Sequence, residues 1–221
     1  MLRLQVNPSQ PPDREILDEV SRTIQRGGIV AFPTETLYGL SVDPRNPAAL
    51  ERLFQIKQRP RSRQLPFVAA DLTQSRQLAR VEGTLALQLA GHFWPGPLTL
   101  VVPLRPDHSL AAWDWGSSLG IRVPASALVR GLAAHLRIPL PATSANLSGE
   151  NTAADPAEFP NTLTDSIDLL LDSGRLPPSL PSTIVSLVQS PPGILRHGAI
   201  SESELAPFLG LARAPVRPSE A

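Results

Sequence analysis

The stretches Leu98-Thr99-Leu100-Val101-Val102 and Leu119-Gly120-Ile121-Arg122-Val123 decide the fold class of this chain. Both are short runs rich in branched and apolar residues, which is typical of buried strands. No helical pattern lies between them, whereas a helix at 126–136 precedes the next strand candidate at 138–142. Strands therefore follow one another both with and without an intervening helix. This pattern predicts a mixed sheet with helices packed on it, in the α/β class.

The same mixture of strands and helices extends outward through the chain. Residues 13–26 carry apolar side chains at helical spacing, and Gly27-Gly28 ends that helix before a buried strand at 29–32. Asn46 followed by Pro47 predicts the start of a helix that continues to Lys57. The remaining expected elements are strands at 65–70, 167–171, 183–187 and 194–195, and helices at 73–80, 84–93 and 201–209.

Composition narrows the class of protein. The chain has 221 residues, of which 42% are hydrophobic and 18% charged, an ordinary globular mixture. The absence of cysteine excludes disulfides, thiolate metal sites and a catalytic thiol. The four histidines are scattered, so we expect no structural zinc. A formal net charge of zero argues against nonspecific coating of nucleic acid. It is still compatible with a local basic patch.

The sequence also suggests where the protein works and how it is divided. The first residues lack the apolar region of a signal peptide, and no apolar run is long enough to span a membrane. We therefore expect a soluble cytoplasmic protein without membrane contact. Proline is enriched, with 25 residues, and residues 212–221 have the composition of a disordered Pro-rich tail. Residues 1–211 are expected to form one domain.

The most unusual charge pattern is the run Lys57-Gln58-Arg59-Pro60-Arg61-Ser62-Arg63, which has four cations in seven residues. No acid between Glu51 and Asp71 neutralises it. Pro60 disfavours helical dihedrals at Arg59, so we expect an extended run in which the three arginines share one face. Guanidinium groups in such a row fit phosphate oxygens well. The alternative interpretation is a solvated basic loop.

Three other places could bind an anion or a small ligand. Pro33-Thr34-Glu35-Thr36 follows a strand and presents hydroxyls and a carboxylate at a sheet edge, although it could be an ordinary capped turn. The segment 141–149 is rich in small and hydroxylated residues and contains Asn146, which is also common in plain loops. Arg122, in an apolar strand, and Arg196 need either solvent or an anion. Because glycine-rich phosphate loops are absent, side chains and turn amides would have to bind any phosphate.

Seven short motifs occur in one order over residues 28–198. They are Pro-Thr-Glu-Thr-x-Tyr-Gly-Leu, Lys-x-Arg-Pro, Trp-Pro-Gly-Pro-Leu-Thr, Ile-Arg-Val-Pro, Thr-Ser-Ala-Asn-Leu-Ser-Gly, Ser-Thr-Ile-Val and Leu-Arg-x-Gly. This set closely resembles the YrdC family of threonylcarbamoyl-AMP synthases. The resemblance implies a twisted sheet around a large positively lined cavity. It also implies formation of L-threonylcarbamoyladenylate and pyrophosphate from L-threonine, bicarbonate and ATP, for modification of tRNA to N6-threonylcarbamoyladenosine.

The resemblance also implies roles for individual residues. Lys57 and Arg59 would be catalytic, and the ATP-binding residues would be Lys57, Arg59, Arg61, Ser118, Ser144, Asn146, Thr152 and Arg196. Threonine would be held by Thr34, Arg122, Ala142 and Ser182, with Arg122 suited to its carboxylate. A magnesium ion would arrive with ATP, without an identifiable protein ligand. The implied partner is the threonylcarbamoyl transferase complex that modifies tRNA, and direct contact with tRNA or double-stranded RNA is left open.

The chain departs from the family pattern after Lys-x-Arg-Pro. Family members often continue with x-x-Lys-Pro-Leu, whereas this chain has Arg63-Gln64-Leu65, which leaves the role of Arg63 open. The chain looks like the short single-domain form, so closure over the site would come from elsewhere, such as the loop 59–63. On this reading, Lys57→Ala or Arg59→Ala abolishes adenylate formation and leaves the fold intact.

Two other functions fit parts of the pattern. A non-catalytic module could bind double-stranded RNA or tRNA through the same basic residues, with an affinity that falls as salt rises. The chain could also be a carbamoyl-AMP-forming domain like that of hydrogenase maturation proteins, although the cysteine-rich motifs of those proteins are absent.

Overall fold

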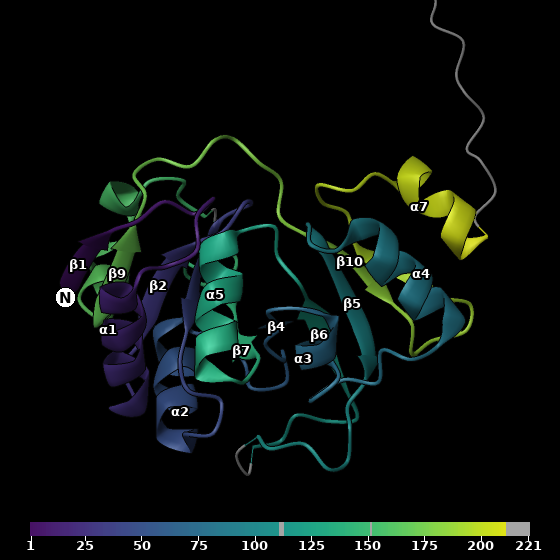
Figure 1. Cartoon of the computed structure of the whole chain (residues 1–221), viewed down its shortest axis with the longest axis horizontal. Helices are drawn as coiled ribbons and strands as arrows, with labels where there is room; N and C mark the ends of the chain where they lie inside the picture. The colour runs from purple at the N-terminus through teal and green to yellow at the C-terminus, as the bar shows by residue number, and fades with distance from the viewer. Residues whose placement is uncertain (111–112, 151, 211–221) are drawn as a thin grey trace, which may run out of the picture.

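The computed structural model describes residues 1–110, 113–150 and 152–210, and their strands form two mixed sheets (Figure 1). The five-stranded sheet has the order β1 (Leu2–Gln5), β9 (Leu169–Asp172), β2 (Val30–Pro33), β3 (Tyr38–Ser41) and β8 (Thr143–Ser144). The six-stranded sheet has the order β11 (Gly193–Arg196), β10 (Thr183–Ser186), β5 (Leu98–Pro103), β6 (Ser118–Arg122), β4 (Phe67–Val68) and β7 (Leu140–Pro141).

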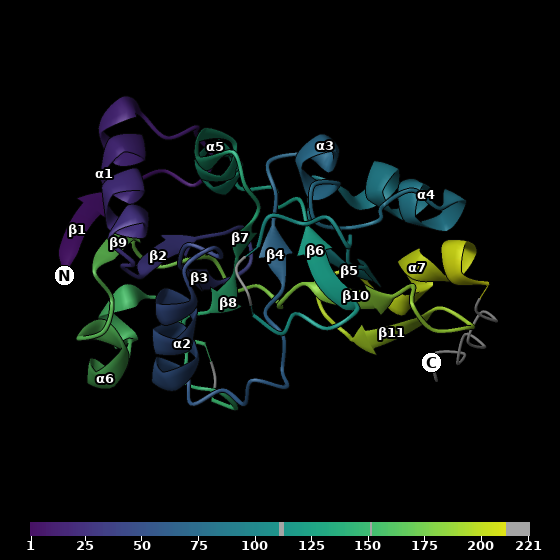
Figure 2. The ribbon, with the colours of Figure 1, turned by 90° about the horizontal axis from the view of Figure 1, so that it is seen from below.

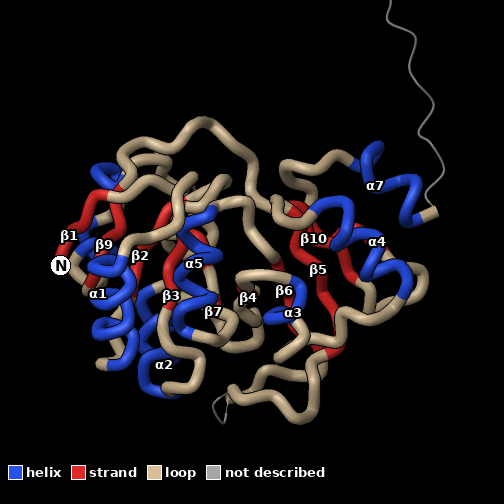
Figure 3. Tube along the Cα trace, viewed as in Figure 1, coloured by secondary structure: helices blue, strands red, loops and turns tan. Residues whose placement is uncertain are grey.

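The two sheets meet at Ala142. This residue alone separates β7, at the edge of one sheet, from β8, at the edge of the other. The backbone N–H of Ala142 donates to the carbonyl of Pro66, 2.8 Å away, which fixes the chain where it crosses between the sheets. Figure 3 shows the strands of both sheets following one another across the molecule. The mixed sheet expected from the sequence is therefore divided in two.

Helices cover both faces of the strands. Figure 2 shows α1 (Arg14–Gln25), α5 (Ala127–Leu136), α3 (Leu72–Ser75) and α4 (Thr84–Phe93) along one side, and α2 (Pro47–Ile56) and α6 (Asn161–Thr164) on the other. The last helix, α7 (Glu202–Leu209), packs beside α4, and a short 3-10 turn, η1, spans Pro156–Glu158. No described helix is long and apolar enough to cross a membrane.

Apolar side chains are buried in two clusters. The smaller one joins α1 and α5 to β2 and β9 of the five-stranded sheet, with Val20, Phe32 and Leu132 among its members. The larger one surrounds β5 and β6 and extends to Tyr38. The Tyr38 hydroxyl donates to the carbonyl of Gly174 at 2.8 Å, and the ring packs edge-on against Phe159. These clusters make both sheets rigid supports for the loops between them.

Most of the expected elements are confirmed, with local differences. The helix start at Asn46 is correct, because the Asn46 side chain accepts the backbone N–H groups of Ala48 and Ala49. The helix expected at 73–80 is wrong in length, since α3 ends at Ser75. The short strands β1, β3 and β8 were not expected. The expected disordered tail, 212–221, lies outside the described residues.

A glycine in the last motif tests the packing beside β10. A methyl group on Gly198 would collide with the backbone of Pro181 and lie 2.6 Å from the Thr183 nitrogen, so Gly198→Ala should destabilise the fold by about 1–3 kcal/mol. The matched control is Gly91→Ala in α4, where a methyl group meets no described atom within 4 Å and should stabilise by about 0.5–1 kcal/mol. Thermal unfolding of both variants measures this, and equal unfolding temperatures would contradict it.

Candidate functional site

The basic run turns back on itself just after α2. The backbone N–H of Arg63 donates to the carbonyl of Pro60 at 2.9 Å, so the expectation of an extended row of arginines is wrong. Arg59 folds over this turn, with its Nε 2.8 Å from the Arg63 carbonyl oxygen and its Nη2 2.7 Å from that of Gln64. Arg61 instead pairs with Glu51 and lies over the ring of Trp113. The three arginines therefore do not share one face.

Lys57 is the most deeply buried charge of the run, with a relative exposure of 1%. Its Nζ donates to the carbonyl oxygens of Ser144 and Asn146 and, at 2.7 Å, to the Asn146 side-chain oxygen. Burial and the charge of Arg59 lower the pKa of Lys57 to about 7, and the three oxygens oppose this because they accept from the charged ammonium group. All three N–H groups are occupied, so Lys57 holds the 144–146 loop in place.

The loop held by Lys57 is itself closely hydrogen-bonded. The Ser144 hydroxyl donates to the Asn146 side-chain oxygen at 2.6 Å, and the Asn146 amide nitrogen donates to the Glu150 carbonyl. The Ser148 backbone N–H reaches the Lys57 carbonyl at 3.0 Å, which ties the loop to the end of α2 from the other side. Lys57 and the distant pair Ser144 and Asn146 therefore form one unit.

Four arginines from three segments of the chain, Arg59 and Arg63 from one loop with Arg122 and Arg196, lie close enough for their charges to interact. Burial, Arg63 and Arg196 together lower the pKa of Arg59. Loss of hydration and the charge of Arg122 lower the pKa of Arg196. Within the described part of the chain, the Arg59 side chain is hydrogen-bonded to backbone carbonyls and no carboxylate pairs with it. Such a group of like charges is suited to bind a polyanion.

Arg196 is anchored beside β10. Its guanidinium donates to the Ser182 carbonyl, with Nη2 2.8 Å from that oxygen, and to the Ser182 hydroxyl at 2.9 Å. The same hydroxyl lies 2.9 Å from the Thr99 hydroxyl on β5. Ser182 and Arg196, predicted to bind different substrates, thus touch each other. Thr99 is an additional polar residue of the site. The sequence did not identify it, because it lies within an otherwise apolar strand.

Arg122 lies at the end of β6 and reaches the turn between β2 and β3. Its Nε donates to the Gly96 carbonyl at 2.9 Å, its Nη1 to the Thr36 hydroxyl at 3.3 Å, and its Nη2 to the Glu35 carboxylate. Thr36 was not among the predicted site residues, although it lies in the same motif. The structure thus brings the first motif and the Ile-Arg-Val-Pro motif together across the boundary between the sheets.

Thr34 shapes the turn that carries Glu35. Its hydroxyl accepts the backbone N–H groups of Thr36 and Leu37 at 3.0 and 3.1 Å and donates to the Leu37 carbonyl at 2.7 Å. These bonds occupy the hydroxyl, so the geometry of the turn depends on it. A ligand that contacted Thr34 would have to share these bonds.

The remaining predicted site residues lie outside this hydrogen-bonded network. Ala142 is the junction between the sheets, and Ser118 begins β6 opposite Pro103. Thr152 follows β8 in a loop. Arg61 pairs with Glu51 and lies over the ring of Trp113. Among the residues that the structure describes, no three acidic or histidine side chains gather as a metal site.

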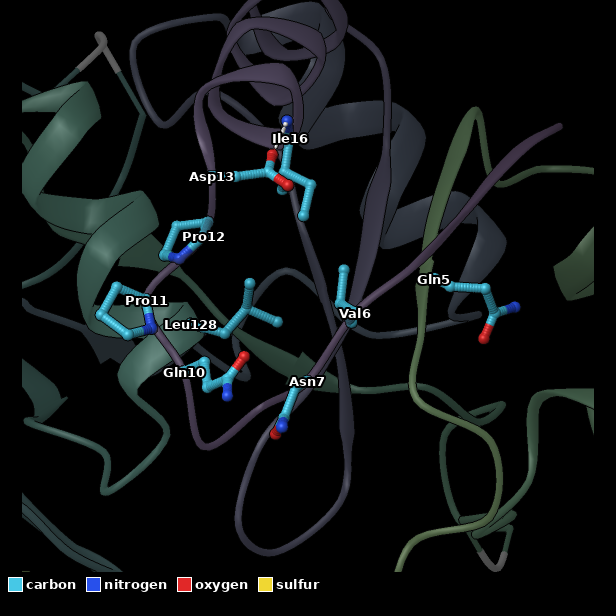
Figure 4. A pocket seen from close by; sticks show the side chains of 9 residues that line it. All are labelled: Gln5, Val6, Asn7, Gln10, Pro11, Pro12, Asp13, Ile16 and Leu128. Carbon is cyan, nitrogen blue, oxygen red and sulfur yellow. Dashed lines mark hydrogen bonds between the residues drawn. The ribbon is translucent and has the colours of Figure 1, made fainter.

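Two hollows lie away from these residues. One, of about 340 Å³, is formed by the loop before α1 together with Leu128 of α5, and its polar lining consists of Gln5, Asn7, Gln10 and Asp13 (Figure 4). The other, of about 260 Å³, is mostly apolar and lies between α3, α4 and Val123. Neither hollow is lined by a predicted ATP or threonine residue.

Comparison with known proteins identifies the class to which this fold and site belong. The family model Sua5_yciO_yrdC, described as telomere recombination, matches residues 22–198. The chain therefore belongs to the Sua5/YciO/YrdC family, which confirms the resemblance found in its motifs.

Solved structures support this assignment. The crystal structure of P. abyssi Sua5 complexed with L-threonine is 29% identical, with a TM-score of 0.83, and the match covers 95% of this chain and 60% of that one. The chain thus spans about three fifths of that protein's length. MTH1692 from Methanobacterium thermoautotrophicum is 31% identical, with a TM-score of 0.63 and coverage of 88% and 92%. E. coli YciO shares the fold, with 24% identity, a TM-score of 0.81 and coverage of 94% and 100%.

Burial of Lys57 changes one expectation from the sequence. Because its ammonium group satisfies three oxygens in the interior, Lys57→Met should lower the free energy of unfolding by about 3 kcal/mol or more. The matched variant Arg59→Met removes a partly exposed cation and should unfold close to the wild-type denaturant concentration. Chemical denaturation of both variants tests this, and a Lys57→Met protein as stable as wild type would rule out the anchoring role.

Proposed function

We propose that the protein is an L-threonylcarbamoyl-AMP synthase, a nucleotidyltransferase that forms L-threonylcarbamoyladenylate and pyrophosphate from L-threonine, bicarbonate and ATP. The observation that carries the proposal is the convergence of Arg59, Arg63, Arg122 and Arg196. Family membership and the L-threonine bound to P. abyssi Sua5 supply the substrate class.

In this reaction the protein has mainly to position the substrates and to stabilise negative charge. The amine of threonine takes up the carbon dioxide of bicarbonate, with release of water, to give a carbamate, whose oxygen attacks the α-phosphorus of ATP and releases pyrophosphate. Negative charge is spread over phosphate oxygens throughout, so fixed guanidinium groups lower the barrier. Arg59 and Arg196 are suited to this role because backbone oxygens orient them and no acid neutralises them in the described structure.

Lys57 contributes indirectly in this account. It fixes the loop that presents the Ser144 hydroxyl and the Asn146 amide, and these groups would contact the nucleotide. Arg122 would bind the carboxylate of threonine, and Ser182, which is hydrogen-bonded to Arg196, would contact threonine beside the ATP site. A magnesium ion bound with ATP would be coordinated by phosphate oxygens and water. The product would pass to the transferase complex that modifies tRNA.

The direct test is pyrophosphate release from ATP and Mg²⁺ with bicarbonate, in the presence and absence of L-threonine. Release that requires both threonine and bicarbonate is expected. Arg59→Ala should reduce this release by at least about tenfold, because removal of one oriented donor costs about that much or more. An exposed control, Arg14→Ala, should retain wild-type release. Failure to bind ATP, together with salt-sensitive binding of tRNA, would contradict the synthase and favour an RNA-binding module.

The substrate assigned to Arg122 can be tested separately. Because Arg122 would contact threonine and not ATP, Arg122→Ala should raise the KM for threonine by about tenfold or more and leave the KM for ATP near its wild-type value. Initial rates measured against each substrate give this comparison. An unchanged KM for threonine would remove Arg122 from the threonine site.

A further inference from the structure

Glu35 brings a carboxylate into a site that otherwise consists of cations and hydroxyls. It lies in the turn between β2 and β3, and one of its oxygens, Oε1, accepts from Arg122 and from the Ala125 backbone N–H at 2.7 Å. Within the described residues, no other carboxylate is hydrogen-bonded to Arg59, Arg122 or Arg196. An acid at this one position requires a reason, because it weakens the attraction for phosphate.

The second carboxylate oxygen of Glu35 is unsatisfied. Oε2 is buried and has no hydrogen-bond partner among the described residues. Arginine and carboxylate commonly pair through both oxygens, and a buried polar atom without a partner costs about 1–3 kcal/mol. The Glu35 side chain as a whole keeps 22% of its exposure, although Oε2 itself is buried. Rotation about its last bond is soft and can turn Oε2 toward a ligand, with a realignment of the two hydrogen bonds that Oε1 accepts.

Arg122 has donors to spare. A guanidinium group carries five N–H donors, and the hydrogen bonds of Arg122 to Gly96, Thr36 and Glu35 use one on each nitrogen. In the described structure, one N–H on each terminal nitrogen therefore has no protein partner. These two donors can bind a ligand carboxylate, and the unpartnered oxygen of Glu35 can accept from a ligand N–H.

We propose that Glu35 is the acceptor for the amino group of the amino acid whose carboxylate Arg122 binds. The cation and the anion stand next to each other, as do the carboxylate and ammonium groups of an amino acid. After the carbamate has formed, the nitrogen keeps one N–H, so the same hydrogen bond can persist during the attack on ATP. Glu35 is thus a specificity residue that favours amino acids over acids without an amine. This inference rests on the proposed function.

The test compares two ligands and two proteins. L-Threonine and 3-hydroxybutyrate, which is threonine without its amino group, are titrated by calorimetry into wild-type protein and Glu35→Gln. Wild-type protein should bind threonine the more tightly. In Glu35→Gln the affinity for threonine should fall about tenfold or more, whereas that for 3-hydroxybutyrate should change by less than about twofold.

A control variant and a folding check keep the result interpretable. Glu158→Gln removes an exposed glutamate that pairs with Arg175, and it should change neither affinity. Thermal unfolding and ATP binding of Glu35→Gln should remain near wild type. Equal loss of affinity for both ligands would overturn the proposal and make Glu35 a positioning residue for Arg122. Tighter binding of both would overturn it as well, because Glu35 would then be a competitor for Arg122.

The outcome also separates this inference from the proposed function. Suppose that wild-type protein binds threonine and that Glu35→Gln prefers threonine over 3-hydroxybutyrate to the same extent. This result would overturn the role of Glu35 and leave the proposed synthase activity unaffected. Wild-type protein that binds no threonine would overturn both.

Discussion

The site depends on like charges held together by backbone oxygens. Arg59 is fixed by the carbonyls of residues 63 and 64, and Arg196 by that of Ser182, so each guanidinium keeps its charge available. Carboxylate partners would have held the same side chains at the cost of cancelling that charge. Lys57 is also held by uncharged oxygens, but it is more deeply buried. Its ammonium group is enclosed by oxygens of the 144–146 loop. Repulsion among these cations is thus built into the unliganded fold, and a polyanion relieves it.

The arrangement of the sheets explains why these residues meet. The chain crosses between the two sheets at Ala142, and the segment that follows carries Ser144 and Asn146 directly to the end of α2. Arg122 reaches from β6 of one sheet to the turn after β2 of the other. Gln64, where family members often have proline, ties the basic loop to the Trp115 carbonyl while its own carbonyl accepts from Arg59. Only the contact to Trp115 depends on the glutamine side chain, because proline would offer the same carbonyl to Arg59.

Sequence reasoning identified the α/β class and most helices and strands, because apolar periodicity and the Asn46 cap are local signals. It missed β3 and β8, which are only four and two residues long and depend on partners distant in the chain. It also placed Arg61 beside Arg59, since Pro60 predicts an extended chain, whereas the Pro60–Arg63 turn and the ring of Trp113 direct Arg61 elsewhere. The motifs indicated Lys57 and Arg122, but whether a cation contacts a ligand or supports a loop depends on tertiary hydrogen bonds. Many of those bonds go to backbone carbonyl groups, which every residue carries and no sequence pattern reveals.

The most direct test of this account is thermal unfolding with and without ATP and Mg²⁺, for wild-type protein, Arg59→Met and Arg196→Met. Ligand that binds the folded state alone stabilises it by about 2.7 kcal/mol at one hundred times its dissociation constant. The account predicts that ATP raises the unfolding temperature of the wild-type protein by several degrees and that each variant loses most of this shift. A wild-type unfolding temperature unaffected by ATP, or an equal shift in all three proteins, would contradict the claim that the converging arginines form a polyanion site.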